Sequence, residues 1–139
     1  HATGEVPMNI KSKKVLDSFI SPGRCEFCET PCLERERHHI FTRGAGHLDL
    51  RCNIIMLGGA FRFGCHKRFH DGNICRAEFL TVVAARDNTT VEAIETLIYL
   101  VRRLPKDAGP ATIWQAIELI SDPIARRLAR DELTFVGIL

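Results

Sequence analysis

The middle of the chain carries cysteines and histidines in a fixed order, and this order constrains the fold more than any other feature. In chain order the motifs are CEFC at 25–28, the pair His38 and His39, Asn53, and CHKRFH at 65–70. Cys25 and Cys28 have the spacing of a metal-binding knuckle. The segment therefore predicts a small fold that is built around bound metal.

The residues between these motifs predict a hairpin followed by a helix. Short apolar pieces, HHIF at 38–41 and NIIML at 53–57, stand among turn residues, which favours two strands around a loop. CHKRFH then opens a helix that is expected to end at Asp71 and Gly72.

The four motif histidines are expected to divide into two kinds. His66 and His70 lie four residues apart, so a helix places both imidazoles on one face, where they can bind one divalent ion. Neighbouring side chains of a strand point to opposite faces, so His38 and His39 are expected to do different work. His38 could be a further ligand from the hairpin, which would leave His39 free for another task.

The remaining sequence predicts further helices. A short one is expected within 11–20, and four more are expected after residue 73. The first covers 74–86, and the second begins at a capping box of Thr89 and Glu92. The third and fourth cover about 111–120 and about 123–133. Asp122 is expected to cap the last helix. Trp114 is expected in the core, and Cys75 is expected to be a small buried apolar residue.

Composition says more about the cellular compartment of the protein than about its function. The formal net charge is +2 and the isoelectric point is about 8.3, so overall charge does not argue for a nucleic-acid partner. No apolar run approaches the ~20 residues that span a bilayer, and the first residues carry no secretory signal. We therefore expect a cytoplasmic protein with no membrane partner, in which disulfides between the six cysteines are the less favoured arrangement.

The order and spacing of the motifs resemble the HNH endonucleases, which have the ββα-metal, or His-Me finger, fold. The resemblance covers about residues 25–72 and rests on CEFC, RHHIFTRGAG, LRCNIIML and GCHKRFHDG. The segments SFISPGRCEFC and LGGAFRFGCH resemble phage and prophage members in particular.

This resemblance implies an α+β fold and a division of the chain. The core would be a small ββα-metal unit, a hairpin plus a helix, with zinc-knuckle-like cysteines and additional, mainly C-terminal helices. Residues 8–73 would form the HNH nuclease core with its N-terminal helix. Residues 74–139 would form a helical extension packed on or beside that core.

The resemblance also implies which residues bind the catalytic ion. His38 matches a ligand at the end of a strand, and His66 and His70 match the ligand positions on the helix. The ion would be Mn²⁺, Ni²⁺, Co²⁺, Mg²⁺ or Zn²⁺. Nitrogen ligands favour the transition metals over Mg²⁺, which prefers oxygen.

Three further residues would carry the chemistry by the same resemblance. His39 matches the general base, since an imidazole can take a proton from water at neutral pH. Asn53 matches the residue that ties down the loop and helps to orient the base. Arg43, in the hairpin loop, could stabilise the charge on the phosphate or only hold the loop. His47, in the same loop, is expected to be solvated.

A structural zinc site is expected at the cysteines. In zinc-bearing relatives four cysteines clamp the loop before the helix, and three of those positions are filled here, by Cys25, Cys28 and Cys65. The fourth position is occupied by Gly58. Structural zinc almost always has four protein ligands, so Cys52, Cys32 or an outside group could complete the site, or zinc could be absent.

The function that the resemblance implies is a metal-dependent DNA endonuclease with little sequence preference. It would leave a 5′-phosphate and a 3′-hydroxyl. The partner is DNA, and phage packaging proteins such as the large terminase are a further expectation, in a bacterial host cell if a phage encodes the chain. The alternative is a non-catalytic DNA-binding or packaging accessory protein, in which metal only holds the fold.

Overall fold

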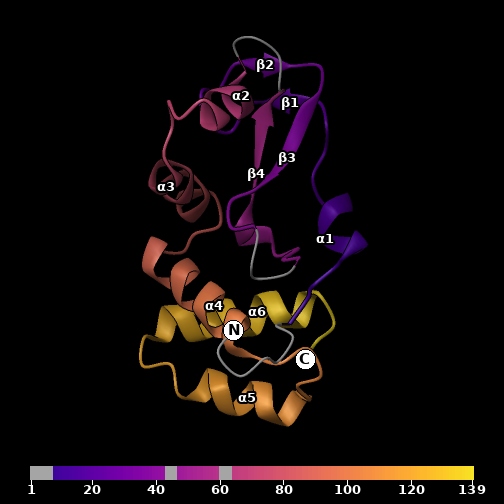
Figure 1. Ribbon diagram of the computed structural model, residues 1–139, viewed down its shortest axis with the longest axis vertical. Helices are drawn as coiled ribbons and strands as arrows, with labels where there is room; N and C mark the ends of the chain where they lie inside the picture. The colour runs from indigo at the N-terminus through magenta and orange to yellow at the C-terminus, as the bar shows by residue number, and fades with distance from the viewer. Residues whose placement is uncertain (1–7, 43–46, 60–63) are drawn as a thin grey trace.

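The computed structural model describes residues 8–42, 47–59 and 64–139 of the chain. Figure 1 shows two small two-stranded sheets and α2 at one end of the molecule, and α4, α5 and α6 at the other. This mixture of helices and small hairpins confirms the α+β class. In chain order the elements are α1 (Lys13–Asp17), β1 (Gly23–Arg24), β2 (Pro31–Cys32), β3 (Arg35–His39), η1 (Arg51–Asn53), β4 (Ile54–Gly58), α2 (Cys65–His70), α3 (Arg76–Arg86), α4 (Val91–Arg103), α5 (Pro110–Glu118) and α6 (Pro123–Phe135).

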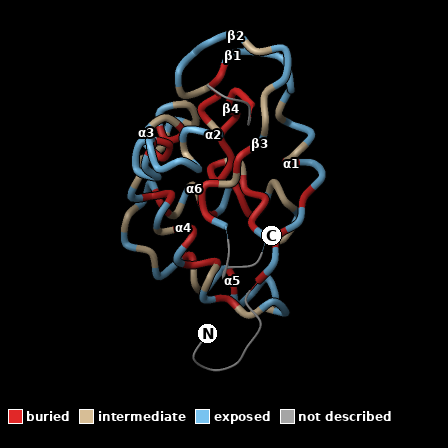
Figure 2. Tube along the Cα trace, turned by 45° about the horizontal axis from the view of Figure 1, so that its top comes forward, coloured by how far each residue is buried: buried red, intermediate tan, exposed pale blue. Residues whose placement is uncertain are grey.

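β3 and β4 form the hairpin that was expected around the adjacent histidines. They pair antiparallel, from Arg35 opposite Gly58 to His39 opposite Ile54. Every residue of β4 is buried, which Figure 2 shows as a continuous buried trace. α2 and α3 pack against this strand. A strand covered in this way has an unbroken apolar sequence rather than an alternating one, which explains the run IIML.

The C-terminal helices α3, α4, α5 and α6 confirm the four helices expected after residue 73. Asp122 caps α6, because its side chain accepts a hydrogen bond of 3.0 Å from the backbone N–H of Ile124. The expected capping residue of α4 is wrong by one position. Thr90, not Thr89, has the extended backbone of an N-cap, and its hydroxyl accepts a bond of 3.0 Å from the N–H of Ala93.

Two side chains that were expected to be buried are exposed. Trp114 is 40% exposed. α5 buries Ile113 and Ile117 instead, so the residue that follows Ile113 is turned about 100° away from the buried face. Cys75 is exposed, because it is the N-cap of α3 at the surface.

A buried carboxylate connects the last helix to the hairpin. Glu132 of α6 is 7% exposed, and it accepts hydrogen bonds from the backbone N–H groups of Arg51 at 2.9 Å and of Cys52 at 3.0 Å. N–H groups at the start of a helix have no partner within it. Burial raises the pKa of Glu132, although the bonds from these amides favour its charged form. α6 thereby holds the short helix η1, which leads directly into β4.

Arg86 of α3 makes a second link to the same segment. Its guanidinium donates hydrogen bonds of 2.8 Å to the carbonyls of Arg51 and Ile54, and pairs with Glu26 at 2.8 Å. Glu26 in turn accepts a bond of 2.7 Å from the backbone N–H of Met56. Buried apolar side chains from the hairpin and from the C-terminal helices also belong to one cluster. The hairpin is therefore supported from the helical side by charge as well as by packing.

The N-terminal segment fixes the return of the hairpin loop. Ile10 forms a parallel bridge with Leu48. The N–H of Asp49 donates a bond of 2.8 Å to the carbonyl of Ile10, and the N–H of Met8 donates one of 3.0 Å to Leu104. Among the described residues, no helix has both the length and the apolar character that a bilayer crossing requires.

We expect Glu132→Ala to destabilise the fold by roughly 2–4 kcal/mol, because it leaves the N–H groups of Arg51 and Cys52 without their acceptor. Glu118→Ala is the matched control, since Glu118 is an exposed glutamate on α5. The free energy of unfolding should be measured by chemical denaturation of the metal-free protein. Equal losses in the two variants would show that the buried carboxylate does not hold η1.

Candidate functional site

Three histidines from the hairpin and the following helix converge. His38 lies in β3, and His66 and His70 lie on α2. Their ligand atoms all lie within 4.8 Å of one another. The ring centroids of His38 and His66 are 4.8 Å apart, those of His66 and His70 are 4.8 Å apart, and those of His38 and His70 are 5.9 Å apart. These are residues that the sequence assigned to one ion, and the chemistry of the set fits a divalent transition metal.

His38 has a buried nitrogen that suits a metal ion. Its side chain is largely buried against the rings of Phe69 and Phe79, and its Nε2 atom has no hydrogen-bond partner among the described residues. Burial, together with the charges of His66, His70 and His39, lowers the pKa of His38 from 6.5 to about 4. The imidazole is therefore neutral at physiological pH, which is the form that binds metal.

His66 is oriented by a carboxylate. Its Nδ1 atom lies 3.0 Å from Oε2 of Glu36, a residue of β3. Imidazoles that bind metal commonly donate their other nitrogen to such a group, which fixes the tautomer and the ring orientation. The contact leaves Nε2 of His66 as the nitrogen that can bind an ion.

His39 belongs to a different group of side chains. Its Nε2 atom lies 2.8 Å from Oδ1 of Asp49, and Nε2 of His47 lies 3.0 Å from the same oxygen. The side chain of Asp49 is only 2% exposed, and its other oxygen accepts a bond of 2.8 Å from the backbone N–H of Ser12. The adjacent histidines of β3 therefore have different partners, as the alternation of a strand predicts.

Asn53 connects the two ends of the hairpin loop. Its side chain is buried, and its carbonyl oxygen accepts a bond of 2.8 Å from the N–H of Phe41. Its amide group donates bonds of 3.0 Å to the carbonyls of Phe41 and Leu48. The backbone N–H of Ile40 also donates to the carbonyl of Asn53 at 2.8 Å. This residue therefore fixes the chain immediately after His39 and immediately before Asp49.

A cysteine cluster lies at the other end of the hairpin. The sulfurs of Cys25, Cys28 and Cys65 lie within 4.8 Å of one another. Burial alone would raise the pKa of Cys28, but hydrogen bonds with Thr30, Cys65 and Cys25 lower it to about 7. Burial and hydrogen bonds with Cys28 and Cys25 raise the pKa of Cys65 to about 12. Three thiols in contact can bind a soft metal ion such as Zn²⁺.

Sequence reasoning missed two carboxylates and one histidine contact. Asp49 stands between Leu48 and Leu50, an alternation that predicts a solvated carboxylate, yet all three residues are buried. Glu36 carried no motif. His47 is exposed, as expected of a solvated side chain, but its contact with Asp49 was not predicted. Arg43, the remaining expected site residue, lies outside the described residues.

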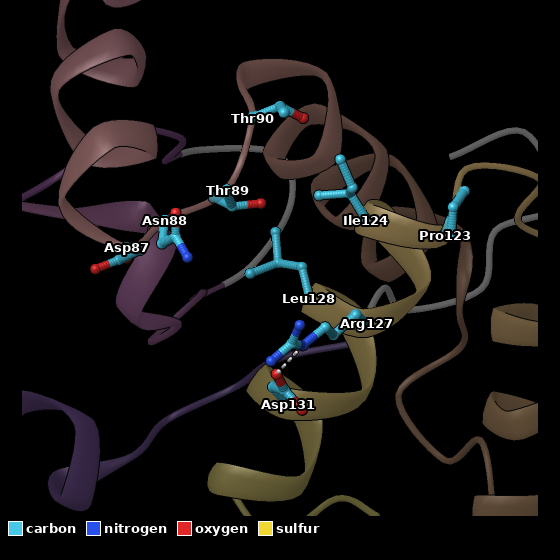
Figure 3. Close-up of a pocket in the computed structure, with 9 residues that line it drawn as sticks. All are labelled: Asp87, Asn88, Thr89, Thr90, Pro123, Ile124, Arg127, Leu128 and Asp131. Atoms are coloured by element: carbon cyan, nitrogen blue, oxygen red, sulfur yellow. Dashed lines mark ion pairs between the residues drawn. The ribbon is translucent and has the colours of Figure 1, made fainter.

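A separate hollow of about 540 Å³ lies between the α3–α4 turn and α6, and it shares no residue with these groups. Figure 3 shows Thr89 and Leu128 among the side chains that line it. Among its lining residues, Asp131 pairs with Arg127 at 3.9 Å, and Asp87 pairs with the neighbouring Arg86 at 2.8 Å. The carboxylates of this hollow are therefore neutralised by arginines.

Comparison with family models, with curated proteins and with solved structures finds no match for this chain. A function therefore has to be argued from the chemistry and geometry of the residues themselves.

We expect His70→Ala to weaken the binding of Ni²⁺ by more than about 100-fold, because losing a direct ligand should cost at least as much as losing a residue that orients one. Lys67→Ala is the matched control, since Lys67 is an exposed residue of the same helix. Titration calorimetry on the full chain gives both affinities. Equal affinities in the two variants would place the ion elsewhere.

Proposed function

We propose that this protein is a metal-dependent DNA endonuclease of the HNH type, in which β3, β4 and α2 form the ββα-metal core. The observation that carries the proposal is the separation of His38 and His39. His38 has a buried nitrogen with no hydrogen-bond partner among the described residues and converges with His66 and His70, whereas its neighbour His39 contacts Asp49. This division matches the roles of ion ligand and general base that the resemblance implies.

The ion ligands would be His38, His66 and His70. A divalent ion bound there would supply positive charge to the scissile phosphate and the departing 3′ oxygen. Glu36 would keep the ring of His66 in place through its Nδ1 atom, and the rings of Phe69 and Phe79 would exclude water from one side of His38.

His39 would act as the general base that takes a proton from the attacking water. A carboxylate can only accept hydrogen bonds, so Nε2 of His39 donates its proton to Asp49 and Nδ1 carries the free lone pair. Nδ1 is then the atom that would accept the proton, and Asp49 would stabilise the imidazolium that forms. Asn53 would keep both in place, because its side chain bridges the chain on either side of the loop.

The outer face of α2 offers cations for the DNA backbone. Lys67 and Arg68 are exposed beside the histidine ligands on the same short helix. Phosphate contacts from such side chains position a protein on DNA without reading its sequence. This fits an endonuclease with little sequence preference.

A structural zinc would complete the core at the cysteines. Cys25 and Cys28 precede the hairpin, and Cys65 begins α2, so an ion bound by all three would tie the start of α2 to the knuckle. A small fold gains much of its stability from such an ion. This ion would be distinct from the one at the histidines.

We expect His39→Ala to reduce the cleavage of supercoiled plasmid by ~10²–10⁴ under single-turnover conditions, because the general base is removed. The variant should bind Ni²⁺ and DNA as the unchanged protein does. His70→Ala is the comparison, since it should lose cleavage and ion binding together. Wild-type cleavage by His39→Ala would reject the base assignment, and no cleavage by the unchanged protein with any ion would favour the accessory-protein alternative.

The identity of the ion gives a further prediction. Because the ligands are three imidazoles, Mn²⁺, Co²⁺ and Ni²⁺ should support cleavage better than Mg²⁺ at equal concentration. Initial rates across these ions, measured on the same plasmid after removal of the histidine-bound ion, provide the test. Activity with Mg²⁺ alone would be incompatible with an all-histidine site.

A further inference from the structure

Cys32 follows the CxxC unit by four positions in the sequence and lies beside the three clustered cysteines. It is the last residue of β2, and it lines the same hollow of about 590 Å³ as Cys25, Cys28 and Cys65. Three thiolates leave one position of a tetrahedral zinc site open. We propose that Cys32 is the fourth ligand, so that the site is a four-cysteine zinc centre. This inference rests on the proposed structural zinc and is independent of the proposed cleavage.

Gly58 shows that the sulfur of Cys32 occupies the space of a missing side chain. A Cβ atom placed on Gly58, the last residue of β4, would lie 3.4 Å from Sγ of Cys32 and 3.9 Å from Cβ of Cys25. A cysteine at position 58 would therefore direct its sulfur into the region that Cys32 now fills. The absence of a side chain at position 58 leaves room for a thiol that comes from β2 instead.

The backbone brings Cys32 to the knuckle through a short hairpin. β1 and β2 pair antiparallel, with Gly23 opposite Cys32, and the N–H of Cys25 donates a bond of 2.9 Å to the carbonyl of Thr30. The sulfurs of Cys28 and Cys32 both contact Thr30. Cys28 donates to its hydroxyl at 3.3 Å, and Cys32 donates to its carbonyl at 3.3 Å. These two thiols therefore both lie next to Thr30.

Ligand formation requires the sulfur of Cys32 to move toward the other three. Its sulfur is not within 4.8 Å of all three clustered sulfurs, so the thiol has to exchange its weak bond to Thr30 for the ion. Rotation about one side-chain bond is sufficient to redirect the sulfur. Each thiol loses its proton to solvent when it binds the ion. Cys28 is exposed and Cys32 is partly exposed, which gives the ion an entry path.

Cys52 does not fit the site. It lies in η1 at the opposite end of β4 from Gly58, and an extended strand of that length spans about 16 Å. Its backbone N–H is bound to Glu132, and its side chain is fully buried. Burial, reinforced by the charges of Glu132 and Asp87, raises the pKa of Cys52 well above its usual value. Cys52 therefore serves as a matched cysteine control.

X-ray absorption at the zinc edge of the whole chain, after removal of the histidine-bound ion, tests this inference directly. The spectrum should report four sulfur neighbours at ~2.3 Å. Cys32→Ser should replace one of them by a lighter atom and speed zinc loss to a chelator by at least tenfold. Cys52→Ser should leave both properties unchanged. The double variant Cys32→Ser with Gly58→Cys should restore four sulfurs, because the new side chain enters the same space.

Each result of this experiment that contradicts the proposal rejects a different part of it. Three sulfurs in the unchanged protein, or four in Cys32→Ser, would reject Cys32 as a ligand while leaving the structural zinc in place. Absence of zinc from the unchanged protein, purified with zinc present, would reject both the fourth ligand and the structural site. Plasmid cleavage by the unchanged protein is measured separately, so neither result is confused with failure of the nuclease proposal. If Cys32→Ser does not fold, the sulfur counts of the double variant and of the unchanged protein still test whether Cys32 is a ligand.

Discussion

The antiparallel pairing of β3 with β4 is the constraint on which the rest of the site depends. It fixes β3 as a strand, and a strand sends neighbouring side chains in opposite directions. His38 can therefore enter the buried space above α2 while His39 contacts Asp49. The proposed ion ligand and the proposed base therefore lie one residue apart, on opposite sides of the strand.

The C-terminal helices support this part of the structure, although His38, His66 and His70, the candidate ion ligands, all lie outside them. Glu132 binds two backbone N–H groups of η1, and Arg86 binds carbonyls on either side of that short helix. These contacts set the path of the chain into Asn53 and β4. The hairpin alone has few residues with which to bury apolar surface, and small folds of this kind need additional supports. The helical region provides such support at one end of β4, and the cysteine cluster lies at the other end.

The sequence predicted the parts of the fold that depend on local pattern. The helix at CHKRFH, the four later helices and the hairpin follow from periodicity and turn residues, and the structure contains all of them. The spacing of His66 and His70 predicted that they share one helix face, whereas their convergence with His38 was expected from the resemblance. Asp49 was missed because its burial depends on the bridge between Ile10 and Leu48, residues that are distant in sequence. Trp114 was misplaced because neighbouring apolar residues of α5 fill the buried face instead.

The most direct measurement is anomalous diffraction from crystals of the full chain soaked in Ni²⁺. We expect a peak bound by His38, His66 and His70 at ~2.0–2.1 Å from each nitrogen, with His39 still on Asp49 and outside the coordination sphere. An ion bound by His39, His47 and Asp49, with none at the other three histidines, would contradict the separation of ligand and base on which the proposed function rests.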